Sequence, residues 1–307
     1  MPWQVKGVGK TALWGCNTDG VWMEDKEGIE CTIIDYFEDI YKSNQLISFD
    51  ASLNSITNCV YLDMNEELLV VFKAEEVWFA LKQMHPTKAL GPAGMSPIFF
   101  KHYWDIVGPE VVNSVLSSLN SGTMPGGLNE THICLIPKVK SPQKIIEFRL
   151  ISLCNVMYKL ISKVLANRLK RVLVAMIDDS QGAFVPSRLI TDNVLVAFET
   201  MHCIDQRKKG KEALMAIKLD MSKAYDRVEW VYLEAMLRKM GFHEIWISIM
   251  MMCVTTVSYS VLINGEPKGR IVPSRGLHQG DPISPYLFLL CAEGLSAMIK
   301  KGKERGT

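Results

Sequence analysis

Apolar and polar side chains alternate along a short stretch in the second half of the chain, "MAIKLDM". Met215, Ile217 and Leu219 occupy every second position, with smaller or polar side chains between them. Because the side chains of a strand point to opposite faces in turn, this pattern predicts a half-buried β-strand that ends near residue 221. Asp220 then lies on the polar face at the carboxyl end of the strand, where it faces a cleft. A helix cap or a solvated surface acid is the alternative role for this carboxylate.

Patterns elsewhere predict a chain with more helices than strands. Helical spacing of apolar residues marks residues 30–41, 74–84, 98–122 with a break at Gly108-Pro109, 152–177, the segment between Ser222 as N-cap and Gly241 as C-terminal stop, and the segment from Ser284 onward. Short apolar runs predict a strand over residues 131–138 and a hairpin over 258–272, in which Asn264-Gly265 forms the turn. Helices and strands therefore follow one another without repeats.

Composition narrows the class of protein. The 307 residues are 48% hydrophobic and carry a formal net charge of +1, which permits a sizeable core and excludes a uniformly basic coat for nucleic acid. The eight cysteines are scattered without a Cys-x-x-Cys pair, a usage typical of reduced thiols in the cytoplasm or nucleus and not of a zinc site. No apolar signal region opens the chain, and the longest apolar run, residues 285–299, contains Glu293. We therefore expect an intracellular protein without a membrane span.

Two further segments invite an interpretation as phosphate-binding sites. "GVGKT" at residues 7–11 resembles the end of a P-loop, but Gln4 stands where the first glycine is needed, so we interpret it as a chance match. Cations are concentrated between Lys138 and Arg171, where Glu147 is the single acid. A solvated cationic face is the simplest interpretation of that segment. Contact with nucleic-acid phosphates gains support only if neighbouring elements point the same way.

Four blocks of sequence supply that support. They are "LIPKVKSPQKIIEFRLISLCNVMYKLISKVLANRLKRVL", "SQGAFVPSRLITDNVLVAFETMH", "IKLDMSKAYDRVEW" and "GLHQGDPISPYLFLLCAEGLSAMI". In this order they resemble the reverse transcriptases of non-LTR (LINE-type) retrotransposons, most closely those of plants. The resemblance implies an α+β right-hand polymerase, with a mainly helical connector over residues 1–130, fingers over 131–213 and part of a palm over 214–307.

The resemblance also implies a role for individual residues at the nucleotide. Arg149 matches the fingers arginine that contacts the triphosphate, and Lys138 is expected to assist it. Tyr225 matches the aromatic residue that excludes the ribose 2′-hydroxyl of a wrong nucleotide. Gln279 and Gly280 match the motif that packs on the nascent base pair. The implied substrates are deoxynucleoside triphosphates.

Asp220 matches the first palm aspartate, which binds two Mg²⁺ ions and is the expected catalytic residue. Two such ions need convergent carboxylates to activate the primer hydroxyl and to stabilise the leaving pyrophosphate. The implied partners are an RNA template and a DNA primer. Their phosphates are expected to contact cations of the basic segment, Lys159, Lys163, Arg168 and Lys170.

The sequence also departs from the family pattern. The second metal-binding pair, in a Tyr/Phe-Ala-Asp-Asp turn after the last helix, is not among residues 1–307, and Asp178-Asp179 precede Asp220, so we interpret them as solvated loop acids. Leu150, His278 and Ala93 replace a proline, a cation and an acid of the family. We therefore expect a partial copy, truncated before the second aspartate motif. The two candidate functions are an RNA-directed DNA polymerase domain that is inactive as this isolated chain and a non-catalytic remnant with at most weak nucleic-acid binding.

Overall fold

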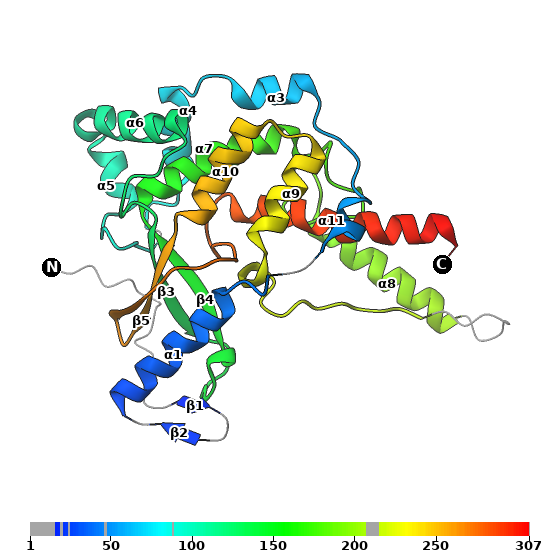
Figure 1. The fold of residues 1–307 in the computed structure, drawn as a ribbon, viewed down its shortest axis with the longest axis horizontal. Helices are drawn as coiled ribbons and strands as arrows, with labels where there is room; N and C mark the ends of the chain where they lie inside the picture. The colour runs from blue at the N-terminus through cyan, green and yellow to red at the C-terminus, as the bar shows by residue number, and fades with distance from the viewer. Residues whose placement is uncertain are drawn as a thin grey trace.

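The computed structural model describes residues 16–18, 21–23, 25–45, 48–87, 89–206 and 215–306. The "GVGKT" segment lies outside the described residues. Eleven α-helices and six strands are described within these ranges (Figure 1). The helices are α1 (Lys26–Tyr41), α2 (Asp50–Leu53), α3 (Leu62–Leu69), α4 (Ala74–Gln83), α5 (Pro97–His102), α6 (Trp104–Ser121), α7 (Val156–Leu173), α8 (Ile190–Gln206), α9 (Trp230–Met240), α10 (Glu244–Thr255) and α11 (Ser284–Arg305). The strands are β1 (Cys16–Thr18), β2 (Val21–Met23), β3 (Glu130–Pro137), β4 (Phe148–Cys154), β5 (Ser258–Ile263) and β6 (Glu266–Ile271). These elements confirm the α+β class.

The main sheet has four strands in the order β4-β3-β5-β6. β3 pairs antiparallel with β4 and parallel with β5, and β5 and β6 form the expected hairpin. Asn264 and Gly265 in its turn have φ of 53° and 89°, the left-handed conformations that a tight hairpin turn requires. The strands 131–138 and 258–272 predicted from sequence are thereby confirmed.

Helix α1 covers one face of this sheet (Figure 1). Ile33 and Phe37 of α1 are buried against Ile133 of β3 and Val261 of β5 in one apolar cluster. The buried residues of α1 recur at helical spacing, as the sequence predicted for residues 30–41. Helix α1 is therefore part of the same packed body as the sheet.

A second, larger core is built from helices. Leu81 of α4, Leu165 of α7, Trp246 of α10 and Leu290 of α11 are all completely or almost completely buried in it. The regions expected as connector, fingers and palm all contribute to this core, and the sheet joins β3 and β4 to β5 and β6. The boundaries at residues 130 and 213 stay a prediction.

Several helix boundaries differ from those predicted. Residues 152–154, expected in a helix, belong to β4, and α7 spans only Val156–Leu173. The break near Pro109 falls instead at Tyr103, between α5 and α6, and Pro109 lies inside α6. Pro109 removes only the hydrogen bond to the carbonyl of Asp105, which lies in the first turn of α6 and is exposed to water. The helix after Asp220 begins at Trp230, so Ser222 is not its N-cap. Its predicted stop at Gly241 is confirmed, with φ of 96°.

The strand predicted around Asp220 is absent from the structure. Residues 215–221 are described as extended chain without strand pairing. The apolar side chains that alternation placed in the core are exposed, Ile217 and Leu219 by 70% each. A strand needs a hydrogen-bonding neighbour, and no described strand pairs with this segment, so the alternating pattern does not produce a strand here.

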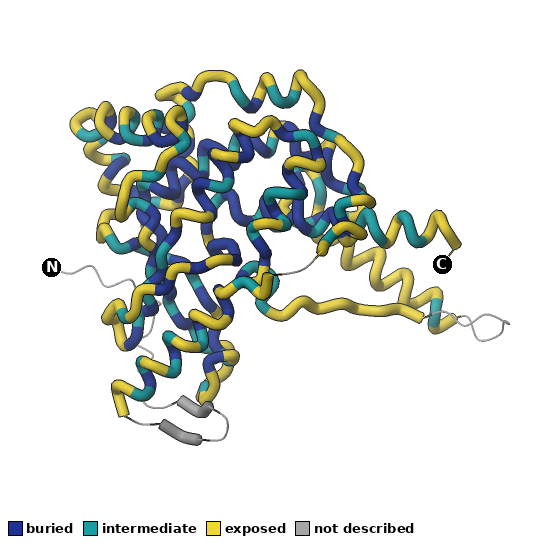
Figure 2. Tube along the Cα trace, viewed as in Figure 1, coloured by how far each residue is buried: buried dark blue, intermediate teal, exposed yellow. Residues whose placement is uncertain are grey.

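Helix α8 precedes this segment and is exposed along its whole length (Figure 2). Its apolar side chains include Val194 and Phe198, which are 63% and 71% exposed. Figure 1 shows α8 projecting from the helical core. Among the described residues, no helix combines the length and apolar character needed to cross a membrane.

Candidate functional site

A cavity of about 230 Å³ lies where the start of β4, the 3-10 turn η2 (Tyr225–Arg227) and the loop before α11 meet. It is lined by Lys138, Phe148, Arg149, Leu150, Lys223, Ala224, Tyr225, Asp226 and Gln279. Lys138, Arg149, Tyr225 and Gln279 are residues that the sequence had assigned to nucleotide contact, and the structure brings them together. The sequence assigned no role to Lys223 or Asp226.

Backbone hydrogen bonds hold the three segments of the cavity in place. The amide of Leu277 donates to the carbonyl of Tyr225 over 2.8 Å, and that of Gly276 donates to Val228 over 2.8 Å. On the other side, the Ser152 amide of β4 donates to the carbonyl of Gln279 over 3.0 Å. The loop that carries Gln279 is therefore fixed both to the η2 turn and to the edge of the sheet.

Glycine is required where this loop passes the turn. Gly276 has φ of 100°, and a Cβ atom there would lie 2.9 Å from the carbonyl oxygen of Asp226 and 3.1 Å from the ring of Tyr41. Any side chain would force these segments apart. Gly280 also has a left-handed φ, 108°. It adjoins Gln279 beside β4, although it does not line the cavity.

The two cations from the sheet differ in how firmly they are held. The Lys138 ammonium donates to the Ile146 carbonyl over 2.9 Å. The Lys138 amide donates to the Glu147 carbonyl over 2.7 Å. Arg149 lies opposite Ile136 in the β3–β4 register, and its side chain is exposed at the cavity. An exposed guanidinium fork beside a fixed ammonium is suited to binding an anion with several oxygens.

Tyr225 forms an aromatic wall of the cavity. Its ring stacks on Phe288 of α11, with centroids 4.8 Å apart and planes 13° from parallel. Partial burial raises the pKa of the Tyr225 phenol, so it stays neutral at physiological pH. The stacking contact with Phe288 supports one face of the ring.

Asp226 is the buried acid of the site, with 5% exposure. The Tyr41 hydroxyl of α1 donates to its Oδ1 over 3.3 Å. Burial raises the pKa of Asp226, while the nearby Lys223 ammonium and the Tyr41 hydrogen bond act in the opposite direction. Sequence reasoning missed this pair because Tyr41 lies far away along the chain. The only local signal was an acid directly after the aromatic residue.

Asp220 lies apart from this arrangement, exposed on the extended segment 215–221. Within the described ranges, no group of three or more His, Cys, Asp or Glu side chains is placed to hold a metal ion. One exposed carboxylate does not provide the convergent ligands that a pair of Mg²⁺ ions requires. The described residues therefore do not fit a complete two-metal site.

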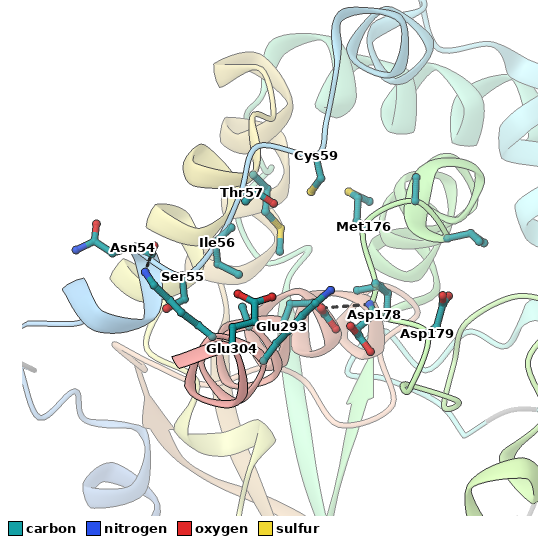
Figure 3. A pocket seen from close by; sticks show the side chains of 17 residues that line it. Asn54, Ser55, Ile56, Thr57, Cys59, Met176, Asp178, Asp179, Glu293 and Glu304 are labelled. Atoms are coloured by element: carbon teal, nitrogen blue, oxygen red, sulfur yellow. Dashed lines mark hydrogen bonds between the residues drawn. The ribbon is translucent and has the colours of Figure 1, made fainter. Parts of the chain in front are cut away.

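The adjacent acids Asp178 and Asp179 lie at a different cavity, of about 700 Å³, bordered by α7 and α11 (Figure 3). The Asp178 amide donates to the Glu293 carboxylate over 3.2 Å, and Asp179 forms an ion pair with Arg188. Hydrogen bonds from Ser180 lower the pKa of Asp178. They are loop acids with local partners, as interpreted from sequence.

The basic segment is less available to nucleic acid than its sequence suggested. Arg168 is buried, and its guanidinium donates to both carboxylate oxygens of Glu76, over 2.8 and 2.7 Å. It also donates to the carbonyls of Leu68 and Val70 and packs over the Phe72 ring. The expected phosphate contact of Arg168 is therefore replaced by a structural role, because its donors are already satisfied within the protein.

The other three residues of that group are lysines on α7, and they differ in exposure. Lys159 is 3% exposed, and its ammonium is 3.5 Å from the Ala89 carbonyl, so it too is turned into the protein. Lys163 and Lys170 are half-buried, and the Lys170 ammonium lies 5.4 Å from the ring centroid of Tyr286. Lys163 and Lys170 are thus the members of this group that retain access to solvent.

Comparison with known proteins identifies one matching family and several similar proteins. Residues 136–305 match the family described as reverse transcriptase (RNA-dependent DNA polymerase). The chain is 28% identical over 285 residues to the Transposon TX1 uncharacterized 149 kDa protein of Xenopus laevis, covering 92% of this chain and 22% of that protein. It is 25% identical over 228 residues to the Pol polyprotein of the type-2 retrotransposable element R2DM of Drosophila melanogaster, covering 72% of this chain and 21% of that one.

A shorter and closer match is to the uncharacterized mitochondrial protein AtMg01250 of Arabidopsis thaliana. It is 58% identical over 45 residues, covering 15% of this chain and 37% of that protein. The chain thus matches only 22%, 37% and 21% of the lengths of these three relatives.

Proposed function

The chain belongs to the reverse transcriptase family and carries a reverse transcriptase domain of the non-LTR retrotransposon kind, and on this premise we propose that its 230 Å³ cavity binds the incoming deoxynucleoside triphosphate. The observation that carries the proposal is the convergence of Lys138, Arg149, Tyr225 and Gln279 on this one cavity. They come from segments that are far apart in the sequence.

Each residue has a task that its chemistry suits. The Arg149 fork and the Lys138 ammonium bind phosphate oxygens, since charge-assisted hydrogen bonds are the strong ones. The Tyr225 ring, immobilised on Phe288, excludes a ribose 2′-hydroxyl by its shape. Gln279, with Gly280 allowing close approach of the backbone, packs against the nascent base pair.

For the polymer substrates we propose an RNA template and a DNA primer. Lys163 and Lys170 are the α7 cations that retain solvent access, and they are proposed to contact phosphates. Each neutralised phosphate adds to the salt dependence of binding. Replacing both lysines by methionine is expected to weaken RNA binding and to lower that dependence.

Asp220 is proposed as one carboxylate ligand of the divalent metal that the family uses. Because the described residues do not complete the ligand set, polymerisation requires a second carboxylate motif that residues 1–307 do not contain. We further propose that the element is of plant type and acts inside the cell. The 58% identity to the Arabidopsis protein supports its plant origin, and the free cysteines, Cys253 among them, support an intracellular site.

The experiment compares nucleotide binding with nucleotide incorporation by residues 1–307. We expect dGTP to bind, Arg149→Ala to weaken that binding about tenfold or more, and no primer extension on an RNA template with Mg²⁺. Incorporation that Asp220→Ala abolishes would refute the need for a second carboxylate motif. Absence of any dGTP binding would favour the non-catalytic remnant instead.

A further inference from the structure

Lys223 occupies an unusual position at the wall of the nucleotide cavity. Its backbone φ is 56°, a left-handed conformation uncommon for a residue with a Cβ. Such conformations persist where the surroundings hold the backbone firmly, and they are frequent at binding sites. Here the hydrogen bonds of the η2 turn to Gly276 and Leu277 provide the constraint. The left-handed backbone delivers the side chain to the cavity.

The charges around the Lys223 ammonium do not balance it. The side chain is half-buried, and no carboxylate of the described residues forms a salt bridge with it, although Asp226 is close enough to attract it. Burial lowers the pKa of Lys223; Asp226 raises it, and the charges of Lys138 and Arg227 lower it further. Without a bound anion, the ammonium is partly desolvated and faces like charges.

The position of the ammonium is nevertheless defined. It lies 6.0 Å from the ring centroid of Tyr36, a cation–π geometry that comes from α1. Asp226, whose charge attracts the ammonium, is itself held by the Tyr41 hydroxyl of α1. Helix α1 lies outside the part of the chain that matches the family, residues 136–305, yet it supplies both contacts.

We propose that Lys223 binds the polyphosphate of the incoming nucleotide, together with Lys138 and Arg149, which line the same cavity. This inference rests on the proposed nucleotide-binding function. An anion of several charges relieves the repulsion between Lys223 and Lys138 and compensates for the desolvation of the ammonium. Asp226 and Tyr36 act as positioning residues, because the carboxylate attracts the ammonium, the Tyr36 ring faces it, and neither side chain carries a positive charge for the phosphate oxygens.

The test measures binding of inorganic tripolyphosphate and of dGTP to residues 1–307 by calorimetry at low salt. Lys223→Met keeps the aliphatic stem and is expected to weaken both affinities by about ten- to a hundredfold. Lys223→Arg is expected to restore most of the loss. Lys218→Met is the matched control. Lys218 is exposed on the neighbouring segment 215–221 and lines none of the cavities described above.

The outcomes distinguish the role of Lys223 from the proposed nucleotide-binding function. If Arg149→Ala weakens binding while Lys223→Met does not, the nucleotide cavity stands and the role of Lys223 is refuted. Equal losses in Lys223→Met and Lys218→Met would also refute it, because overall charge would then explain both. If the unmodified chain binds neither probe, the proposed function fails and the inference fails with it. Lys223→Gln gives a second neutral variant should the methionine variant not fold.

Discussion

The hydroxyl of Tyr41, at the end of α1, donates a hydrogen bond to the buried carboxylate of Asp226 across 185 residues of sequence. Tyr41 also stacks on Tyr259 of β5, with ring centroids 4.8 Å apart. Helix α1, the sheet and the turn that lines the proposed nucleotide cavity therefore meet at one side chain.

Tyr41→Phe is expected to reduce the free energy of unfolding by about 1–3 kcal/mol, because it leaves a buried carboxylate without its donor. Urea unfolding measures the change. Tyr61→Phe is the control, since the Tyr61 side chain is 62% exposed. Equal stability of the two variants would show that the Tyr41 hydroxyl contributes nothing.

The burial of His278 predicts that the protein loses stability in acid. It is buried between Tyr158 and Tyr259, and burial lowers its pKa from 6.5 to about 3. Between pH 6.5 and about 3, only the unfolded chain takes up the proton on this histidine. The stability that the protein gains from keeping His278 neutral is therefore complete above pH 6.5 and is lost as the pH falls towards 3. The slope is about 1.4 kcal/mol per pH unit.

His278→Phe is expected to remove that part of the pH dependence, measured as urea unfolding midpoints from neutral pH downwards. The buried carboxyls Asp226 and Asp281, with raised pKa values, remain in both proteins and cancel in the difference. His102→Phe, at an exposed histidine, is expected to retain the wild-type slope. Parallel curves for the wild type and His278→Phe would contradict the prediction.

Arg168→Met is expected to destabilise the fold by about 3 kcal/mol. This is the lower end for breaking a buried ion pair, because the partner Glu76 keeps a side-chain exposure of 25% and can be rehydrated. Arg171→Met removes an exposed pair with Glu67, at 3.5 Å, and is expected to cost no more than about 0.5 kcal/mol. A similar small effect of both substitutions would restore Arg168 as a candidate for phosphate contact.

Gly276→Ala tests the close passage of the loop over the η2 turn. A Cβ atom 2.9 Å from the Asp226 carbonyl, at φ of 100°, is expected to cost about 2 kcal/mol or more and to weaken dGTP binding. Gly126→Ala is the control, since a Cβ there meets nothing within 4 Å. Unchanged stability and affinity in Gly276→Ala would mean that the loop can move away without consequence.

Local chemistry made part of this fold predictable. Asn264-Gly265 predicts the hairpin turn, because both residues tolerate the left-handed conformations found there. The apolar spacing of residues 74–84 and the glycine at 241 define α4 and the end of α9 in the same way. In each case the determining contacts lie within a few residues of the signal.

Features that depend on distant partners were not predictable. The alternation around Asp220 is typical of a strand, but a sequence pattern cannot show whether another strand pairs with that segment. In the sequence, Arg168 cannot be distinguished from the other cations of α7, because the carbonyl that it binds belongs to Leu68, 100 residues away. The residues proposed to contact the nucleotide were identified through family resemblance, whereas Lys223 and Asp226 became evident only from the cavity that they line.

The parallel pairing of β3 with β5 sets an order of assembly. β3 and β4 are neighbours in sequence and can form an antiparallel pair early, but Ile133 meets its partner Val261 only after α7 to α10 have been synthesised. Pairings between such distant segments form slowly. On the ribosome, the β3–β4 pair and its α1 cover must therefore wait with an open edge until the β5–β6 hairpin emerges. This interval is when a nascent chain of this kind is most exposed to aggregation.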